Sequence, residues 1–520
     1  MSRYDPAALQ RLLFRRQFVL GPRAVDRFPS WQHVALGPDL WLTVHPDLGV
    51  TRVAAGERSA VLLGYVVDPS HPAAGDAEIL AALLDGARAG GDVLERTASL
   101  GGRWVLVVHD GERTILFADA AGLRQVAYTE GPAPGQRWCA SQPALLAEVV
   151  GARTDDEAAA FLASADPDRH TSLLWFPGDA TPYHGVRVLL PNHYLDLRTG
   201  RPTRYWPVTD VPVTTRRAAL GRSLEIITGL MEGVGGRFAL MPALTAGWDS
   251  RITLAASRAA SGSAFYYTGL FGEKTEDAPD VTVPSRLLAR MGLRHAILDG
   301  RSRIDDAFAA TYRRNVTPAF EPYCALAQAV LDGSPDGGVI VSGDAGEIVR
   351  CDDASGRFAG GDLTARDLAA LTRLPEHPFA LAAFERWLAG ARAHRHNVPL
   401  RDLFAWEQEA GRLQAALLAE LDIARESFAP FSCRTLLTTL LGVSERYRQE
   451  PAYYLFRSLI RRLWPDVLVE PINGWPQVGA QAALRRTLEW AGLLRLVPRP
   501  VKRMAKRLLG RNGSDSGADA

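Results

Sequence analysis

The sequence of 520 residues is poor in cysteine and in lysine. Its four cysteines are scattered: Cys139, Cys324, Cys351 and Cys433. They show neither C-x-x-C spacing nor the density of a disulfide scaffold, so we expect plain thiols in a reducing compartment. Nearly all of the 59 basic residues are arginines, and the lysines are Lys274, Lys502 and Lys506. Any chemistry that needs a basic side chain therefore has few lysines to draw on.

The chain also lacks an excess of charge and a long apolar run. It has 59 basic and 58 acidic residues, so no global field favours nucleic acid as a partner. The apolar residues 12–14 are followed at once by Arg15 and Arg16, which is not the pattern of a signal peptide. No stretch reaches the length that spans a membrane. We expect a cytoplasmic protein with no membrane span and no nucleic-acid partner.

Hydrophobic residues make up 47% of the chain, enough for a large core in two or three domains. Up to about residue 205, short runs with strand character alternate with turn residues. These runs are "AVLLGYVV" (60–67), "RWVLVVHDG" (103–111), "RTILFADA" (113–120) and "RVLLPNHYLDL" (187–197). The first part of the chain is therefore predicted to be rich in sheet.

After a linker at 207–217 the pattern changes, and strand-like runs alternate with helical ones, which predicts a parallel α/β sheet. Long helix-like segments follow at 361–465, including "ERWLAGARAHRH" and "QEAGRLQAALLAELDIARESF", and predict a helical subdomain. The stretch 501–520 begins as a short basic amphipathic helix and ends in a Gly/Ser/Asp tail. We expect it to be a solvated terminus; contact with an anionic membrane surface or a partner is the alternative.

The junction "ALTAGWDSRITLAASR" (243–258) sets a strand-like run against a glycine-bearing turn and a helix-like run. Such a turn aims backbone N–H groups and the positive end of a helix dipole at one point, where anions bind. Asp249 would repel a phosphate there unless a cation such as Mg²⁺ lay between them, while Ser250 and Arg251 could bind phosphate oxygens. The alternative is a plain N-cap by Asp249 or Ser250.

A second acidic loop follows another apolar run, in "GGVIVSGDAGE" (337–347). Ligands of open α/β sheets bind beyond the carboxyl ends of the strands, so two such loops at neighbouring strands would face one pocket. Asp249 and Glu347 could then share one Mg²⁺ ion.

These motifs resemble those of the asparagine synthetase family, whose relatives include β-lactam synthetases and lasso-peptide cyclases. "TAGWDS" resembles the family's Ser-Gly-Gly-x-Asp-Ser pyrophosphatase loop, and "VSGDAGE" resembles its second loop. Weaker matches occur in the family's order along nearly the whole chain, among them 100–129, 176–206 and 266–295. The resemblance implies an N-terminal-nucleophile-like sandwich at 1–206, a parallel α/β (PP-loop) domain with a helical C-terminal part at 207–500, and a tail at 501–520.

The resemblance further implies ATP and Mg²⁺ as cofactors and an AMP-forming ligase that joins a small-molecule or peptide carboxylate to an amine or ammonia. The phosphate loop would be Thr245, Gly247, Asp249 and Ser250. Ser342 and Gly343 would lie at the nucleotide edge, Asp249 and Glu347 would bind the metal, and Asp344 would orient the amine or accept its proton. Arg251 and Lys274 are our candidates for the cation at the reacting phosphate. A homodimer is one expected assembly.

The sequence departs from the family at several points. Position 2 is Ser2 where the family's glutaminase has its nucleophilic cysteine, and "LGYVVDP" (63–69) replaces the glutamine-binding stretch, so we expect no glutaminase activity. Ala246 replaces a glycine of the phosphate loop, and "LVEPINGWPQ" (468–477) lacks the family's lysine. A catalytically degenerate nucleotide-binding or scaffold protein is therefore the alternative.

Overall fold

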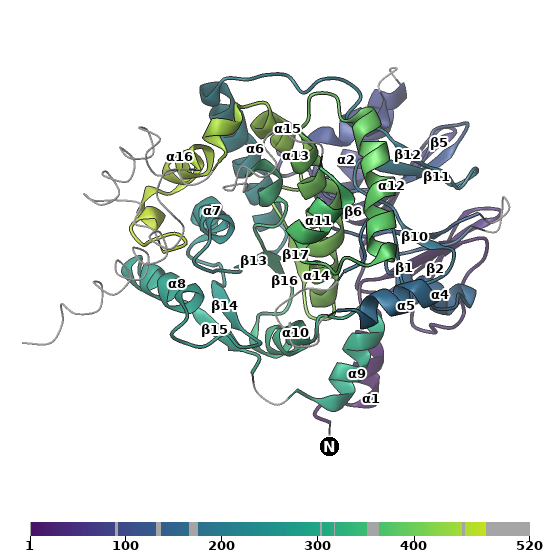
Figure 1. Cartoon of the computed structure of the whole chain (residues 1–520), viewed down its shortest axis with the longest axis horizontal. Coiled ribbons are helices and arrows are strands. Elements are labelled where there is room, and N and C mark those ends of the chain that lie inside the picture. The colour runs from purple at the N-terminus through teal and green to yellow at the C-terminus, as the bar shows by residue number, and fades with distance from the viewer. Residues whose placement is uncertain are drawn as a thin grey trace, which may run out of the picture.

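The computed structural model describes residues 2–88, 92–131, 137–165, 175–301, 304–316, 318–350, 363–449 and 453–474 (Figure 1). Within these ranges the chain is a mixed α/β protein with several sheets. None of the helices described there is both long enough and apolar enough to cross a membrane. The predicted tail at 501–520 lies outside the described residues.

Two six-stranded antiparallel sheets form from the part of the chain predicted to be rich in strands. The first has the order β10-β8-β9-β1-β3-β2 and comprises β1 (Phe18–Gly21), β2 (Gln32–Gly37), β3 (Leu40–Val44), β8 (Ala127–Thr129), β9 (Cys139–Ala140) and β10 (Val186–Val188). The second has the order β12-β11-β7-β6-β5-β4 and comprises β4 (Val50–Ala55), β5 (Arg58–Val67), β6 (Gly101–His109), β7 (Thr114–Ala118), β11 (His193–Asp196) and β12 (Pro202–Arg204). The predicted strands at 60–67, 103–111 and 113–120 are confirmed as β5, β6 and β7.

The two antiparallel sheets share one apolar core, and helices cover their outer faces. Successive residues of a strand point to opposite faces, and β5 follows this rule: Val61 and Leu63 belong to the core between the sheets. Ala60 and Leu62 belong instead to a cluster with the covering helices α2 (Asp76–Arg88) and α3 (Val93–Arg96). Helix α4 (Pro143–Val150) packs on the outer face of the other sheet. Strand β5 is therefore apolar on both faces, whereas strands such as β2 and β12 carry exposed polar residues.

The second part of the chain forms a parallel sheet. Strands β13 (Ala239–Pro242), β16 (Gly338–Val341) and β17 (Glu426–Phe428) pair in parallel, as do β14 (Tyr267–Leu270) and β15 (Ala296–Asp299). A parallel bridge between Ala243 and Tyr267 joins the two groups in the order β15-β14-β13-β16-β17. In this order the direction of chain progression reverses between β13 and β16, and such a reversal is where open α/β sheets bind ligands.

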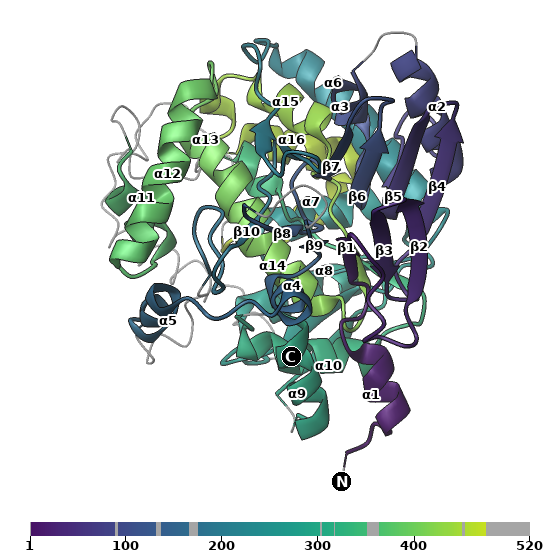
Figure 2. The ribbon, with the colours of Figure 1, turned by 90° about the vertical axis from the view of Figure 1, so that its right-hand side faces the viewer.

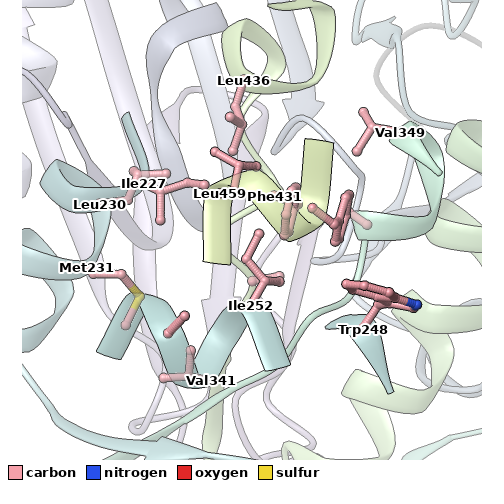
Figure 3. Packing of buried hydrophobic residues seen from close by; sticks show 14 of the residues in the cluster. Ile227, Leu230, Met231, Trp248, Ile252, Val341, Val349, Phe431, Leu436 and Leu459 are labelled. Carbon is pink, nitrogen blue, oxygen red and sulfur yellow. The ribbon is translucent and has the colours of Figure 1, made fainter. Parts of the chain in front are cut away.

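Helices cover both faces of the parallel sheet. Leu240 and Val339 point into one apolar cluster and Met241 and Ile340 into another, as the alternation of strand residues requires. The first cluster is covered by α6 (Arg216–Gly235), α7 (Trp248–Ala256), α8 (Pro279–Arg290), α15 (Arg434–Leu441) and α16 (Tyr454–Leu463), several of which meet in Figure 3. The second is covered by α1 (Pro6–Leu12), α9 (Asp306–Asn315) and α10 (Glu321–Gly333). Helices α1 and α9 lie side by side in Figures 1 and 2.

The predicted helical region is confirmed in most of its length. Its elements are α11 (Ala365–Thr372), α12 (Pro378–His394), α13 (Leu400–Phe404), the π-helix η4 (Ala405–Gln414) and α14 (Ala415–Leu421), and α5 (Asp156–Ala163) packs against them. The prediction is wrong at the end of "QEAGRLQAALLAELDIARESF", where residues 426–428 form β17 instead of a helix. These residues pair with β16 at the edge of the parallel sheet, so tertiary pairing overrides their local preference. Short 3₁₀ helices complete the described fold: η1 (Thr97–Ser99), η2 (Ser257–Ala260), η3 (Gly346–Val349), η5 (Glu445–Tyr447) and η6 (Pro465–Leu468).

A buried cluster of charges joins the sandwich to the edge of the parallel sheet. Arg103 in β6 donates to Glu426 Oε1 at 3.0 Å and to Asp422 Oδ2 at 2.9 Å, and Arg124 donates to Glu426 Oε2 at 2.6 Å. Burial by itself raises the pKa of Glu426, but Arg124 and Arg103 outweigh it and lower that pKa to about 2. Tyr65 adds a hydrogen bond from its hydroxyl to the carbonyl of Ser427 at 2.8 Å. Strand β17 is therefore held from both of its sides.

We predict that Glu426→Gln lowers the free energy of unfolding by about 3–5 kcal/mol, because it leaves two buried guanidinium groups with too little negative charge. Equilibrium urea denaturation measures the change. The matched control is Glu321→Gln, which breaks the exposed pair between Glu321 and Arg313 and is expected to lower stability by less than about 1 kcal/mol. Equal losses in the two variants would contradict this account of the interface.

Candidate functional site

The first candidate loop is a junction between a strand and a helix, as the sequence predicts: it connects β13 to α7. The structure places this junction at the centre of the parallel sheet. Helix α7 begins at Trp248 with Gly247 as its N-cap, and Gly247 has no side chain to bind the first N–H groups. Ser250 donates through Oγ to the carbonyl of Thr245 at 2.9 Å, and the two hydroxyl oxygens lie 3.1 Å apart. The N–H of Gly247 donates to Thr245 Oγ1 at 3.3 Å. Two hydroxyl groups therefore gather at the positive end of α7.

Asp280 and Lys274 flank this loop. The N–H of Ala246 donates to Asp280 Oδ1 at 3.1 Å, and Lys274 Nζ lies 3.5 Å from Asp280 Oδ2. Lys274 also lies over the ring of Phe271, 4.9 Å from its centroid. The structure thus places Lys274 close to the first candidate loop, with the Asp280 carboxylate between them.

The second candidate loop follows β16 and leads into η3. Ser342 donates through Oγ to Asp344 Oδ2 at 2.5 Å. Burial raises the pKa of Asp344 to about 6; the Ser342 hydrogen bond acts in the opposite direction, and the charge of Asp249 adds to the rise. Ala345 adopts the left-handed conformation at φ 64° and donates through its N–H to Gln414 Oε1 at 2.8 Å. The pKa of Asp344 therefore lies well above that of an exposed aspartate.

The two loops touch each other. A Cβ atom on Gly343 would lie 2.3 Å from Asp249 Cβ and 2.7 Å from the backbone carbon of Asp249. Backbone atoms at that distance cannot yield as a flexible side chain can, so only glycine fits at this position. The two loops are therefore neighbours, with Gly343 of the second packed against Asp249 of the first.

The acids predicted to share a metal converge on an arginine that the sequence analysis did not single out. Arg350 lies with Nη2 2.8 Å from Asp249 Oδ2 and 3.4 Å from Glu347 Oε1. Its side chain is only 7% exposed, and its guanidinium carbon lies 5.7 Å and 5.9 Å from the ring centroids of Tyr453 and Phe456. From the sequence, Arg350 reads as a local partner of Glu347 three residues earlier. Only the tertiary contact between the loops adds Asp249.

The structure places Arg251 away from the position we expected. Its side chain is buried and donates to the carbonyls of Val467 at 2.6 Å, Glu470 at 3.0 Å and Pro471 at 2.9 Å. These carbonyls lie in and just after η6, where helix ends leave acceptors without partners. Burial lowers the pKa of Arg251 to about 10. Arg251 therefore clamps the segment after η6 instead of pointing its charge at the junction of the loops.

A divalent cation suits the donor set formed by Asp249 and Glu347. Carboxylate oxygens are hard ligands of the type Mg²⁺ prefers, and Mg²⁺ commonly takes one or two carboxylates together with phosphate oxygens. In this structure the cation at which the two carboxylates converge is the Arg350 guanidinium. Among the residues that the structure describes, no group of three or more His, Cys, Asp or Glu side chains is arranged to hold a metal ion.

No protein-family model matches this sequence, and no curated protein sequence matches it. Solved structures that are similar to it include the following three. An allosteric regulatory enzyme of purine biosynthesis is 11% identical over 60% of this chain and 74% of its own, with a TM-score of 0.23. The glutamine phosphoribosylpyrophosphate amidotransferase of B. subtilis, complexed with ADP and GMP, is 11% identical over 65% and 77%, with a TM-score of 0.21. The NAD⁺ synthetase of Burkholderia pseudomallei is 15% identical over 50% and 90%, with a TM-score of 0.17. At TM-scores this low, the similarity to these structures does not establish a shared fold or function.

We predict that Gly343→Ala separates the two loops and destabilises the protein by about 1–3 kcal/mol, the usual loss when an extra methyl group is forced into a packed site. Thermal unfolding of the purified variant measures the loss. Gly221→Ala in α6 is the matched control, because nothing lies within 4 Å of its added Cβ, and alanine there favours the helix by up to about 1 kcal/mol. A Gly343→Ala variant as stable as the unsubstituted protein would contradict the close contact.

Asp344 gives a prediction for the pH dependence of stability. Its pKa is raised in the folded state, so its stabilising contribution is complete below its unfolded pKa of 3.8 and is lost as pH rises through about 6. Asp344→Asn cannot titrate at this position. The stability of Asp344→Asn relative to the unsubstituted protein should therefore increase by on the order of 1–3 kcal/mol between pH 4 and pH 7.5. Urea denaturation at a series of pH values tests this, and a flat difference would show that Asp344 does not titrate in this range.

Proposed function

We propose that this chain is an ATP-dependent, AMP-forming amide ligase. In this function a substrate carboxylate attacks the α-phosphate of ATP, pyrophosphate leaves, and an amine attacks the carbonyl carbon of the acyl-adenylate. The observation that carries the proposal is the contact between two acidic loops at the point where the strand order reverses, between β13 and β16. Two loops of this kind at one such point suit a ligand with a long anionic part.

The first loop would hold the phosphates. Thr245, Gly247 and Ser250 lie at the positive end of α7, where hydroxyl and N–H groups can donate to phosphate oxygens. Ser342 and Gly343 would lie at the edge of the nucleotide, because they begin the second loop, which packs against the first loop. Asp249 and Glu347 would hold Mg²⁺, which supplies positive charge beside the leaving pyrophosphate when it is bound.

Asp344 is the proposed group that orients the amine or accepts its proton. A general base works best when its pKa lies near the operating pH, and burial brings the pKa of Asp344 to about 6. Lys274 is the remaining proposed cation near the first loop, in keeping with its position beside Asp280. The carboxylate would belong to a small molecule or a peptide.

The placement of Ser2 supports an amine source other than glutamine. Ser2 donates through Oγ to Asp305 at 2.9 Å, at the start of α9, on a helix that covers the parallel sheet. The first strand of the sandwich begins only at Phe18. Ser2 therefore lies against the helices of the parallel sheet and not within the sandwich. We therefore propose free ammonia or an amine of the substrate as the nucleophile.

A catalytically degenerate nucleotide-binding or scaffold protein is the second candidate. Two contacts favour it: Arg251 is committed to backbone carbonyls, and Asp280 already accepts from the N–H of Ala246. The first contact occupies a guanidinium group and the second a backbone N–H group, and a phosphate would use both as donors. The two candidates differ in one measurable step, the reversible formation of an acyl-adenylate.

Exchange of labelled pyrophosphate into ATP, measured with a panel of amino-acid and peptide carboxylates, tests the ligase. We expect at least one carboxylate to stimulate exchange, and Asp249→Asn to reduce it at least about a hundredfold, as the loss of one electrostatic group at a reacting centre does. Asp110→Asn, at an exposed turn where Asp110 pairs with Arg113, is the matched control and should exchange normally. No exchange with any carboxylate would favour the degenerate protein, and calorimetry with MgATP would then separate a nucleotide-binding protein, which gives a heat of binding, from a scaffold, which gives none.

A further inference from the structure

Arg350 places a guanidinium at the junction of the two loops. Its Nη2 atom lies 2.8 Å from Asp249 in the first loop and 3.4 Å from Glu347 just after the second. Arg251 and Lys274, the cations expected from the sequence, bind backbone carbonyls and Asp280 instead. Among these three basic groups, only Arg350 pairs with carboxylates from both loop regions.

The position of Arg350 is fixed from several sides. Its guanidinium lies over two aromatic rings, those of Tyr453 and Phe456, and cations attract the faces of such rings. Gln414 links the second loop to this cluster, because it donates to Glu347 Oε2 at 3.2 Å and accepts from the N–H of Ala345. The Arg350 side chain is almost wholly buried, whereas the Asp249 side chain is 27% exposed and the Glu347 side chain 43%, so solvent screens the pair with Asp249 less than the pair with Glu347.

A guanidinium and a divalent cation compete for the same carboxylate oxygens. A free Mg²⁺ ion at this pair would have to replace Arg350 and leave its buried charge without those partners, which is strongly unfavourable. A Mg²⁺ ion that arrives with pyrophosphate brings oxygens to which a guanidinium donates well, often through two parallel hydrogen bonds. The arginine would then exchange one anionic partner for another.

We infer that Arg350 acts as the internal counter-ion of the Asp249–Glu347 pair, excludes a free divalent cation from it, and pairs with a phosphate group once metal and pyrophosphate bind together. This inference rests on the proposed function for the nature of the ligand. It assigns to Arg350 the phosphate-binding charge for which the sequence supplies no lysine in the segment 468–477. It also makes metal and pyrophosphate depend on each other for binding.

The experiment uses the full chain and two probes. Mn²⁺ alone, which favours oxygen ligands as Mg²⁺ does, is titrated and its free concentration is read by electron paramagnetic resonance. Labelled inorganic pyrophosphate is then bound at saturating Mg²⁺ and measured by equilibrium dialysis. The variants are Arg350→Met, Arg350→Lys and the double variant Arg350→Met, Asp249→Asn, with thermal unfolding as a check on the fold of each.

We expect Arg350→Met to bind Mn²⁺ alone at least about tenfold more tightly than the unsubstituted protein, and Mg²⁺-pyrophosphate at least about tenfold more weakly, within the usual range of coupling between two ligands. Arg350→Lys keeps the charge and should exclude Mn²⁺ nearly as well. The double variant should lose the gain in Mn²⁺ binding, which places the metal at Asp249. General damage to the site would weaken the binding of both probes and could not strengthen one while weakening the other.

Unchanged or weaker Mn²⁺ binding by Arg350→Met would overturn the inference, as would unchanged binding of Mg²⁺-pyrophosphate. Should Arg350→Met fail to fold, Arg350→Lys decides, because its shorter ammonium group should still exclude Mn²⁺ but weaken Mg²⁺-pyrophosphate binding. Neither probe requires ATP or turnover. If Arg350→Met binds Mn²⁺ more tightly and Mg²⁺-pyrophosphate more weakly, but the protein shows no pyrophosphate exchange into ATP, the role of Arg350 is upheld and the ligase is rejected.

Discussion

The close contact between Gly343 and Asp249 is the constraint on which the candidate site depends. It exists because β13 and β16 are neighbours in the parallel sheet, so that the loops after them leave the sheet at one edge. A side chain at position 343 would push the backbone of α7 away. Glycine there lets the first acid of one loop lie within reach of the arginine that follows the other. The charge pattern of the junction is thus a consequence of backbone packing.

The edge strand β17 connects this junction to the antiparallel sandwich. It pairs with β16, whose end carries the second loop, and its Glu426 lies among buried arginines of the sandwich. Ser432, just after β17, donates to Asp119 at 2.7 Å, and Asp119 in turn binds the N–H groups of Leu123 and Arg124. The sandwich therefore supports the parallel sheet at the strand next to the candidate site. The sandwich thus has a structural role in the fold, whatever chemistry it has of its own.

Much of this architecture could be predicted from local patterns. The apolar runs before Thr245 and Ser342 are strong strand signals, and the glycine and acidic residues after them mark loops at strand ends. Residues 426–428 could not be predicted in this way, because their strand exists only through pairing with β16. The direction of the Arg251 side chain could not be predicted from the sequence either. It depends on η6 lying against α7, and the two are separated by more than two hundred residues in sequence.

Because lysine is scarce, most basic side chains of the chain are arginines, and the nearness of an arginine to a loop in the sequence does not show what it binds. An arginine fork can bind several carbonyls at once, which a lysine cannot do with the same geometry. The chain uses this property repeatedly: Arg412 donates to the carbonyls of Phe176 and Ala180, and Arg425 donates to those of Ser334 and Pro335. Arg251 belongs to this class of buried clamps. Arg350 differs because its partners at the junction are carboxylates from two loops, and carboxylates, unlike carbonyls, are groups that a metal ion can take over.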